Sequence, residues 1–231
     1  MLRAPVPGLV AMRQAVILAA GRGERLRPRT DFLPKPLLSV AGRPLIVRHL
    51  DHLAAAGVER IFINLSHLGA LLPRFLGRQW QGMSLEYSDE RAQRLETGGA
   101  LIALRERLEN APFLLLNGDI CTEHPLAQLL AGDPGLVMVD NPAHHPEGDF
   151  AMEKGRVTVP AAGPPTYTYS GLALLDAAWL ANFPSGPAPL APWLRQWVAK
   201  GLLRAYLQQG YWCDVGTPER LQAARLHYGG A

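Results

Sequence analysis

Cysteine is scarce in this sequence: its 231 residues contain two, Cys121 and Cys213. Two cysteines without a CxxC spacing exclude a disulfide scaffold and argue against a structural zinc site, so we expect both to be small buried residues. Long apolar runs are also lacking, and Ala111 to Leu116 is among the longest. None approaches the roughly 20 residues that span a bilayer, so the sequence predicts no membrane partner.

A secretory signal is absent from the first residues. The segment from Met1 to Ala11 carries one charge and a short Leu9-Val10-Ala11 run, too little for the hydrophobic region of a signal peptide. We therefore expect a cytoplasmic location and interpret residues 1–11 as an N-terminal extension. Residues 12–231 are expected to form one domain with a single activity, because the segment after Tyr228 is too short for a second one.

Net charge is nearly balanced, with 23 Lys and Arg against 20 Asp and Glu. A net charge of +3 is too small to indicate a basic surface that binds nucleic acid, so no nucleic-acid partner is predicted. Residues 20–35 nevertheless hold five basic and two acidic residues, which leaves 18 of each sign in the rest of the chain. The whole excess of positive charge therefore lies in one short segment.

Short apolar runs alternate with segments of helical periodicity in the first part of the chain. Strands are predicted at 14–19, 60–64, 84–87, 113–116 and 136–139, with helices at 44–56, 68–76 and 100–108. This alternation indicates an α/β fold whose parallel sheet carries helices on both faces. The remainder is irregular and Pro-rich, with strands predicted at 150–152, 157, 167–175, 203–207 and 211–215 and helices at 190–199 and 217–228.

A loop rich in glycine and arginine follows the first predicted strand, at the edge where an open α/β sheet binds ligands. Gly21 and Gly23 let backbone amides approach phosphate oxygens, and the arginines add fixed charge. A dinucleotide loop would require glycine where Leu26 stands, and a Walker A ending is absent. A polyphosphate loop of another kind and a tight turn with solvated arginines both remain open.

Two aspartates, Asp119 and Asp214, are each predicted at or near a strand end beside a glycine. Mg²⁺ prefers one or two carboxylates together with phosphate oxygens and water, so the pair could serve a triphosphate. Taken alone, each aspartate is more typical of a turn or a helix cap. Alternation along the strand places Cys213 on the face opposite Asp214, so this cysteine is not expected to be a ligand.

The pattern LAAGxGxRLxPxT, present from Leu18 to Thr30 and followed by Pro34-Lys35-Pro36, resembles the sugar-phosphate nucleotidyltransferases. These enzymes join a nucleoside triphosphate to a sugar 1-phosphate. The resemblance implies a Rossmann-like three-layer sandwich with a mostly parallel central sheet, an irregular sugar-binding second half and a nucleotidyltransferase domain over residues 12–231. It implies that Arg25 stabilises the leaving pyrophosphate, that Lys35 bridges the two reacting phosphates, and that Asp119 and Asp214 hold Mg²⁺ as the cofactor.

The resemblance also assigns the two ends of the substrate. The segment from Leu95 to Ala100 is expected to approach the nucleobase, with Thr97 as the N-cap of a helix and its glycines leaving room for a flat base. The stretch from Asp89 to Arg94 departs most from the family pattern, so no side chain there is assigned to the base. The expected nucleotide-binding residues are Ala20, Gly21, Arg22, Gly23, Lys35, Thr97, Gly98 and Asn117. The expected sugar-binding residues are Gly118, Asn141, Asp149, Glu153, Ser170 and Gly171.

The order of several segments narrows the expected substrates. The stretch from Asp140 to Phe150, the ETGG segment, Tyr169-Ser170-Gly171 and the WxDVGT segment resemble the uridylyltransferases of the family that act on N-acetylmuramate 1-phosphate in peptidoglycan recycling. UTP and this sugar 1-phosphate are therefore the expected partners, with no prediction of oligomeric state. Mannose 1-phosphate with GTP, or glucose 1-phosphate with UTP or dTTP, is the alternative. A catalytically silent nucleotide-sugar sensor is an alternative of another class, disfavoured by the intact set of Arg25, Lys35 and both aspartates.

Overall fold

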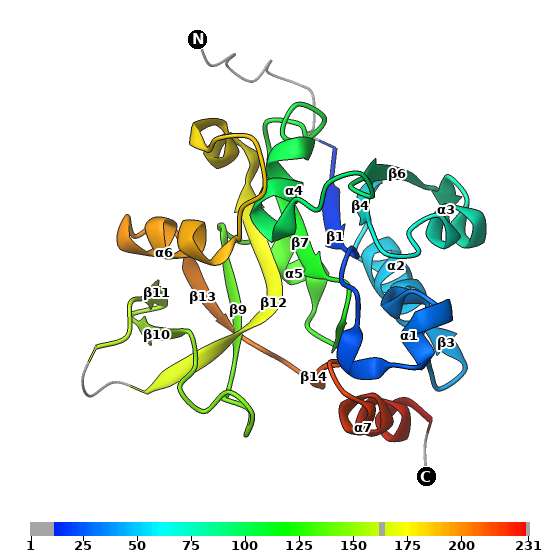
Figure 1. The fold of residues 1–231 in the computed structure, drawn as a ribbon. Helices are drawn as coiled ribbons and strands as arrows, with labels where there is room; N and C mark the ends of the chain where they lie inside the picture. Colours follow the sequence, from blue (N-terminus) through cyan, green and yellow to red (C-terminus); the bar gives the residue numbers. More distant parts are fainter. Residues whose placement is uncertain (1–11, 162–164, 230–231) are drawn as a thin grey trace.

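The computed structural model describes residues 12–161 and 165–229, and the expected extension at residues 1–11 lies outside the described residues. Its centre is a twisted sheet of ten strands (Figure 1). In spatial order the strands are β10 (Phe150–Glu153), β11 (Arg156–Thr158), β13 (Arg204–Leu207), β9 (Gly135–Val139), β12 (Thr166–Asp176), β7 (Pro112–Asn117), β1 (Gln14–Leu18), β4 (Arg60–Leu65), β6 (Met83–Asp89) and β5 (Gln79–Trp80).

The half of the sheet that carries the glycine-rich loop is parallel. Strands β7, β1, β4 and β6 run in the same direction, and their apolar residues form continuous buried rows. Strand β12 then inserts antiparallel between β7 and β9. The α/β prediction is confirmed, and the irregular second half forms the mixed part of the same sheet, in which β9 and β13 pair parallel and the other pairs are antiparallel.

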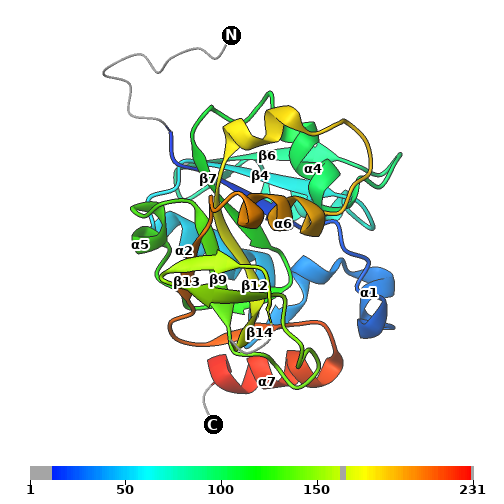
Figure 2. The same cartoon turned by 90° about the vertical axis from the view of Figure 1, so that its left-hand side faces the viewer.

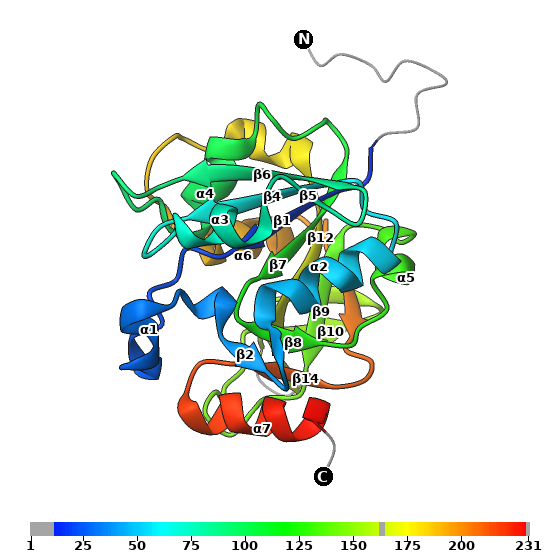
Figure 3. The same cartoon turned by 90° about the vertical axis from the view of Figure 1, so that its right-hand side faces the viewer.

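Helices cover both faces of the sheet, which gives the three expected layers. On one face lie α2 (Leu45–Ala55), α3 (Leu71–Leu76) and α5 (Leu126–Leu130), seen in front of the sheet in Figure 3. On the other lie α4 (Glu96–Leu104), α6 (Ala191–Ala199) and the 3-10 helix η3 (Ala177–Asn182), seen in Figure 2. Alternation along β1 explains the arrangement, because Ala15 and Ile17 pack in the first layer and Val16 packs in the second.

The segments that follow the glycine-rich loop pack with the last helix of the chain and form a smaller unit. It contains η1 (Glu24–Leu26), α1 (Arg29–Phe32), η2 (Lys35–Leu37), the hairpin of β2 (Ser39–Val40) and β3 (Arg43–Pro44), and α7 (Pro218–Gly229). Strand β8 (Ile120–Thr122) pairs antiparallel with β14 (Trp212–Asp214) within this unit. A separate apolar cluster that includes Leu26, Cys121 and Val215 holds it together at the lower edge of the sheet in Figure 1.

The cysteine and helix predictions are partly correct. Cys121 is buried as expected, whereas Cys213 is half-buried. The helix expected at 100–108 begins four residues earlier, at Glu96, and ends at Leu104. Because the helix starts before Thr97, the prediction that this threonine is its N-cap is wrong. Within the described ranges, no helix has both the length and the apolar character needed to cross a membrane.

Candidate active site

A cavity of about 440 Å³ opens at the carboxyl ends of β1, β4 and β7. Its wall is formed by the glycine-rich loop, the β7–β8 turn and the start of α4. The residues that line it are Leu18, Ala19, Ala20, Gly21, Gly23, Arg25, Lys35, Pro36, Asn64, Glu90, Arg94, Glu96, Thr97, Asn117, Gly118, Asp119 and Gly216. The cavity therefore lies at the edge where the sequence predicts a ligand.

The glycine-rich loop is shaped by Gly23. This residue has a φ of +64°, and a side-chain carbon there would lie 2.8 Å from Cγ2 of Thr30. The Thr30 hydroxyl donates to the Gly23 carbonyl at 2.8 Å, which fixes the turn that leads into η1. Only glycine satisfies both the left-handed backbone and the close packing at position 23. Helix η1 begins directly after this turn, and its Arg25 lies on the cavity wall.

Lys35 and Asp119 form the most closely paired charges in the cavity. Their Nζ and Oδ2 atoms are 2.6 Å apart, with the lysine buried and the aspartate partly exposed. Asp119 is held there by Gly118, whose amide donates to the Leu18 carbonyl at 2.8 Å. A side-chain carbon at Gly118 would lie 2.8 Å from the same oxygen, so glycine allows the β7–β8 turn to approach β1.

Asp214 lies at the end of β14, opposite Ile120 in the register of the β8–β14 pair. The Val215 amide donates to the Asp119 carbonyl at 2.7 Å, so the two aspartates come from neighbouring backbone segments far apart in the sequence. The Asp214 carboxylate forms an ion pair with Arg220 at 3.2 Å and lies 3.5 Å from the His144 ring. Both acids are thus balanced by cations of this chain.

The two aspartates fit a magnesium ion shared with a phosphate ligand. Among the described residues, no group of three or more His, Cys, Asp or Glu side chains could hold a metal by itself. Magnesium commonly binds one or two carboxylates and takes its other ligands from substrate phosphates and water. Asp119 already lines the cavity, so this donor set suits a metal that arrives with a triphosphate.

Asn64 and Glu90 form a buried polar pair that the sequence reasoning missed. Asn64 accepts from the Ala19 amide at 2.6 Å and donates to Glu90 at 2.9 Å. The Leu95 amide donates to the other Glu90 oxygen at 3.3 Å. Burial raises the pKa of Glu90, and these hydrogen bonds oppose the rise. The available signal in the sequence was Asn64, a polar residue near the end of the apolar strand β4.

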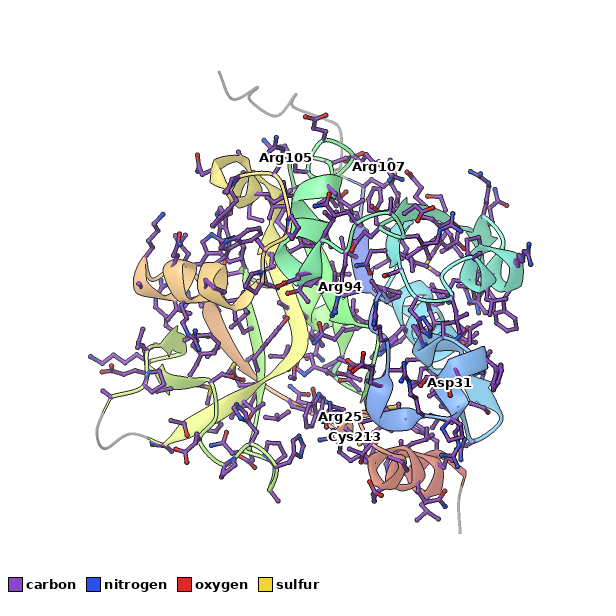
Figure 4. All side chains as sticks on the ribbon, in the orientation of Figure 1. Arg25, Asp31, Arg94, Arg105, Arg107 and Cys213 are labelled. Carbon is purple, nitrogen blue, oxygen red and sulfur yellow. The ribbon has the colours of Figure 1, made fainter. Side chains whose placement is uncertain are left out.

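Glu90 and Arg94 both line the cavity, although the sequence assigned no side chain between Asp89 and Arg94 to the ligand. Figure 4 shows Arg94 nearer α4 and Arg25 nearer α7, so the cavity has basic residues toward both ends. Glu90 is nearly fully buried and held by fixed donors. This stretch therefore contributes directly to the cavity despite its unusual sequence.

The glycines that open α4 pack against the chain that precedes α6. The amides of Gly98 and Gly99 both donate to the Ala188 carbonyl, at 2.8 and 3.0 Å. A side-chain carbon at Gly99 would lie 2.3 Å from the Gly186 carbonyl oxygen. The glycines therefore make room for the chain that precedes α6. Thr97 lines the cavity, and its hydroxyl accepts from the Leu190 amide at 2.9 Å.

The residues expected to bind the sugar divide into two groups. Gly118 lines the cavity, whereas the remaining five do not. Asn141 is engaged with Thr166, Thr168 and the Pro146 carbonyl, and Asp149 accepts from the Tyr169 amide at 2.8 Å. Glu153 is exposed in the β10–β11 hairpin. These three residues shape the region beyond β12 in the structure.

Ser170 and Gly171 lie in an irregular part of β12, between Tyr169 and Ala173. Gly171 has a φ of +84°, and a side-chain carbon there would lie 2.7 Å from Nδ2 of Asn117. The Ser170 carbonyl accepts from the Trp212 indole at 2.9 Å. The irregularity thus lets Asn117, which lines the cavity, pack against β12.

The structure brings most of the expected nucleotide-binding and catalytic residues together. Those on the cavity wall are Ala20, Gly21, Gly23, Arg25, Lys35, Thr97, Asn117 and Asp119. Arg22 is exposed beside Glu24, and Gly98 packs toward α6. Asp214 does not line the cavity itself but adjoins it through Gly216.

A buried lysine paired with a partly exposed aspartate, beside an arginine-bearing glycine loop, is an arrangement suited to a phosphorylated ligand. The family model described as "Nucleotidyl transferase" matches residues 14–133, where this loop and Asp119 lie. The chain belongs to this family, and it is a sugar-phosphate nucleotidyltransferase. The resemblance seen in the sequence is therefore confirmed.

Known proteins extend the likeness over nearly the whole chain. The sequence is 39% identical over 223 residues to an N-acetylmuramate alpha-1-phosphate uridylyltransferase of Neisseria meningitidis serogroup B, covering 92% of this chain and 96% of the relative. It is 34% identical to the protein of the same name from Caulobacter vibrioides, covering 93% and 96%. The mannose-1-phosphate guanylyltransferase catalytic subunit beta of Danio rerio is 28% identical, and the match covers 89% of this chain and 62% of that protein.

Solved structures show the same fold. A UTP-bound UGPase from Acinetobacter baumannii aligns with a TM-score of 0.80 at 19% identity, covering 94% of this chain and 93% of the other. HddC from Yersinia pseudotuberculosis, complexed with GMP-PN, aligns with a TM-score of 0.75 at 24% identity, covering 94% and 100%. The three-layer α/β architecture is therefore the architecture of these proteins.

Proposed function

We propose that this chain condenses UTP with N-acetylmuramate 1-phosphate to give the UDP-sugar and pyrophosphate, as a step of peptidoglycan recycling in the cytoplasm. The observation that carries the chemistry is the pairing of Lys35 with Asp119 on the cavity wall, beside the strand that bears Asp214. The choice of substrates is supported by two relatives of that name, each matched over 96% of its length. We assign the activity to residues 12–231, with residues 1–11 as an extension.

In the proposed reaction a sugar-phosphate oxygen attacks the α-phosphorus of UTP in line. The new P–O bond forms as the bond from the α-phosphorus to the bridging oxygen breaks, and pyrophosphate leaves with that electron pair. Because the attacking oxygen is already anionic, the reaction needs no general base. Positioning and neutralisation of charge must therefore supply most of the acceleration.

The cavity residues provide these two contributions. Lys35 would contact the attacking phosphate and the α-phosphate, which requires it to share its charge between Asp119 and the substrates. Arg25 would contact the departing pyrophosphate, and Asp119 and Asp214 would hold Mg²⁺. When bound, magnesium adds positive charge where the phosphates carry negative charge. Backbone amides of Gly21 and Gly23 add donors along the same wall.

We assign Asn64 and Glu90 to the part of the cavity that binds the base of the nucleotide. Both line the cavity together with Thr97, and their carbonyl and carboxylate oxygens are acceptors held in place by hydrogen bonds. Uracil and guanine each present a ring N–H to such acceptors, so the choice of UTP rests on the named relatives. The sugar would lie on the side of Gly118 and Asn117, toward β12.

A grid assay tests the substrate assignment. Release of pyrophosphate in the presence of Mg²⁺ is measured for UTP, dTTP and GTP against N-acetylmuramate, mannose and glucose 1-phosphates. We expect N-acetylmuramate 1-phosphate with UTP to give the highest kcat/KM. Higher kcat/KM for mannose 1-phosphate with GTP would favour the guanylyltransferase alternative, and binding of nucleotide sugars without pyrophosphate release would favour the sensor.

Matched variants test the residue roles. Asp119→Asn and Asp214→Asn should each abolish magnesium-dependent turnover, because an amide replaces a carboxylate ligand. Asp133→Asn serves as the control, since this aspartate is exposed and pairs with Arg204 at 3.1 Å, away from the cavity. Near wild-type turnover in either of the first two variants would contradict the assignment of the metal site.

A further inference from the structure

Two arginines from opposite ends of the chain converge on Gly216. A side-chain carbon placed at Gly216 would lie 2.1 Å from Nη2 of Arg220 and 3.0 Å from Nη2 of Arg25. Both distances start from the same point, so the two nitrogens are at most 5.1 Å apart, the sum of the two. Figure 4 shows Arg25 beside β14 where it meets the loop from β1, and Gly216 follows that strand on the cavity wall.

Arg220 has donors that lack acceptors. Its side chain is 17% exposed, and Nη1 is 3.2 Å from the Asp214 carboxylate. Its Nε and Nη2 atoms are buried and have no hydrogen-bond partner among the described residues. Buried polar groups are normally paired, and an unpaired donor on a charged group is costly. Arg220 therefore has capacity for an acceptor that the described part of the chain does not provide.

The charges around Gly216 also favour the binding of an anion. Arg25 has no ion pair among residues 12–161 and 165–229, and Asp214 is the carboxylate paired with Arg220. Two guanidinium groups this close repel each other, and the repulsion is stronger where water is excluded. A phosphate anion would relieve it, because each guanidinium can bind phosphate oxygens through two parallel N–H groups.

We propose that Arg220 and Arg25 together bind the pyrophosphate part of the nucleotide, which makes Arg220 a further phosphate-binding residue. The inference rests on the proposed function, in which pyrophosphate leaves on the Arg25 side of the cavity. Asp214 orients the Arg220 guanidinium through Nη1, and pyrophosphate oxygens accept from Nε and Nη2. Gly216 leaves open the space that the Arg220 guanidinium occupies between the two segments.

A purely structural role is the rival explanation, since Arg220 also ties α7 to β14 through Asp214. A brace that acts through Asp214 would change pyrophosphate affinity only when Mg²⁺ is present, because Asp214 is assigned to the metal, whereas direct contact changes the affinity with and without Mg²⁺. The experiment is calorimetric titration of the full chain with inorganic pyrophosphate, without Mg²⁺ and with it, for wild type, Arg220→Gln and Arg220→Lys. Arg225→Gln is the control, because Arg225 lies on the same helix and makes an exposed hydrogen bond to the Ser39 carbonyl.

We expect Arg220→Gln to weaken pyrophosphate binding about tenfold to a hundredfold, with and without Mg²⁺, as loss of charged hydrogen bonds does, with Arg225→Gln unchanged. In the reverse reaction, KM for pyrophosphate should rise by a similar factor while KM for the UDP-sugar stays within about twofold. Arg220→Lys should be intermediate, since it keeps the charge without the planar fork; it is also the decisive variant if Arg220→Gln does not fold. Pyrophosphate affinity that is unchanged in the folded variants, or that changes only when Mg²⁺ is present, would overturn the inference.

The wild-type measurements separate this inference from the proposed function. If the wild type releases pyrophosphate from UTP and binds it, but Arg220 variants bind it equally well, only the role of Arg220 is wrong. If the wild type neither turns over any pair in the substrate grid nor binds pyrophosphate, the proposed function is wrong and the role of Arg220 is refuted with it.

Discussion

Acid should destabilise the folded chain through His49, which lies on α2 beneath the turn that carries Asp119. The imidazole is 3% exposed, and its Nε2 has no hydrogen-bond partner among the described residues. The pKa of His49 is lowered from 6.5 to about 4, chiefly by burial and in part by the nearby His52, while Asp119 and the Ile120 backbone oppose the change. The buried ring is therefore neutral at pH 7.

The sign and size follow from the two pKa values. An unfolded chain takes up the His49 proton near pH 6.5, whereas the folded chain takes it up near pH 4. Between these values the unfolded state binds more protons, so the free energy of unfolding falls as the pH is lowered. At about 1.4 kcal/mol per pH unit, the full contribution is about 3 kcal/mol, and about 2 kcal/mol is lost by pH 5.

Urea unfolding of wild type and His49→Gln at pH 7, 6 and 5 measures this contribution. Glutamine does not titrate, so the difference in unfolding free energy between the two proteins should shrink by about 2 kcal/mol from pH 7 to pH 5. His67→Gln, which replaces a half-buried histidine bonded to the Thr30 carbonyl, is the control and should follow the wild type. A constant difference between wild type and His49→Gln over this range would refute the reasoning.

Three further changes have expected outcomes. Lys35→Ala should lower kcat by orders of magnitude while thermal unfolding shows an intact fold, and an unchanged rate would refute its role. Gly99→Ala should lower the free energy of unfolding, measured in urea, by about 2 kcal/mol, because the new methyl group would meet the Gly186 carbonyl. Unaltered stability would show that the segment around Gly186 moves aside without cost. Hydrogen bonding from Arg60 lowers the pKa of Glu86, so its stabilisation is present at neutral pH and is lost in acid. Glu86→Gln should therefore cost about 1 kcal/mol at pH 7 and less at pH 3, and an equal cost at both would contradict this.

Much of the parallel half of the fold could be predicted from the sequence. The strands from Gln14 to Leu18 and from Pro112 to Asn117 are short apolar runs bounded by polar or glycine-rich turns, and their burial on both faces makes those runs continuous. The antiparallel insertion of β12 was not predictable in the same way. Strand direction depends on which partners are reached after the chain has folded back, and periodicity carries no information about that.

The residues of the site also differ in how far the sequence could predict their positions. Gly23, Arg25 and Lys35 lie within thirteen residues of one another, so the short helices η1, α1 and η2 are enough to bring them to one cavity. Asp214 reaches the same region only because β14 pairs with β8. Gly98 and Gly99 show what local sequence cannot predict. Two adjacent glycines indicate that another group approaches the backbone closely, but only the structure shows that the chain before α6 does so.

The sequence by itself determined the α/β class, the glycine-rich loop, the concentration of positive charge in residues 20–35 and the likeness to a family. These are properties of neighbouring residues, because turns and strand periodicity are set by backbone geometry over a few positions. Only the tertiary structure decided that Asn64 would bind Glu90, and that Arg220 would approach Arg25 across Gly216. Such contacts join distant segments, and their distances are fixed by the packing of the whole chain.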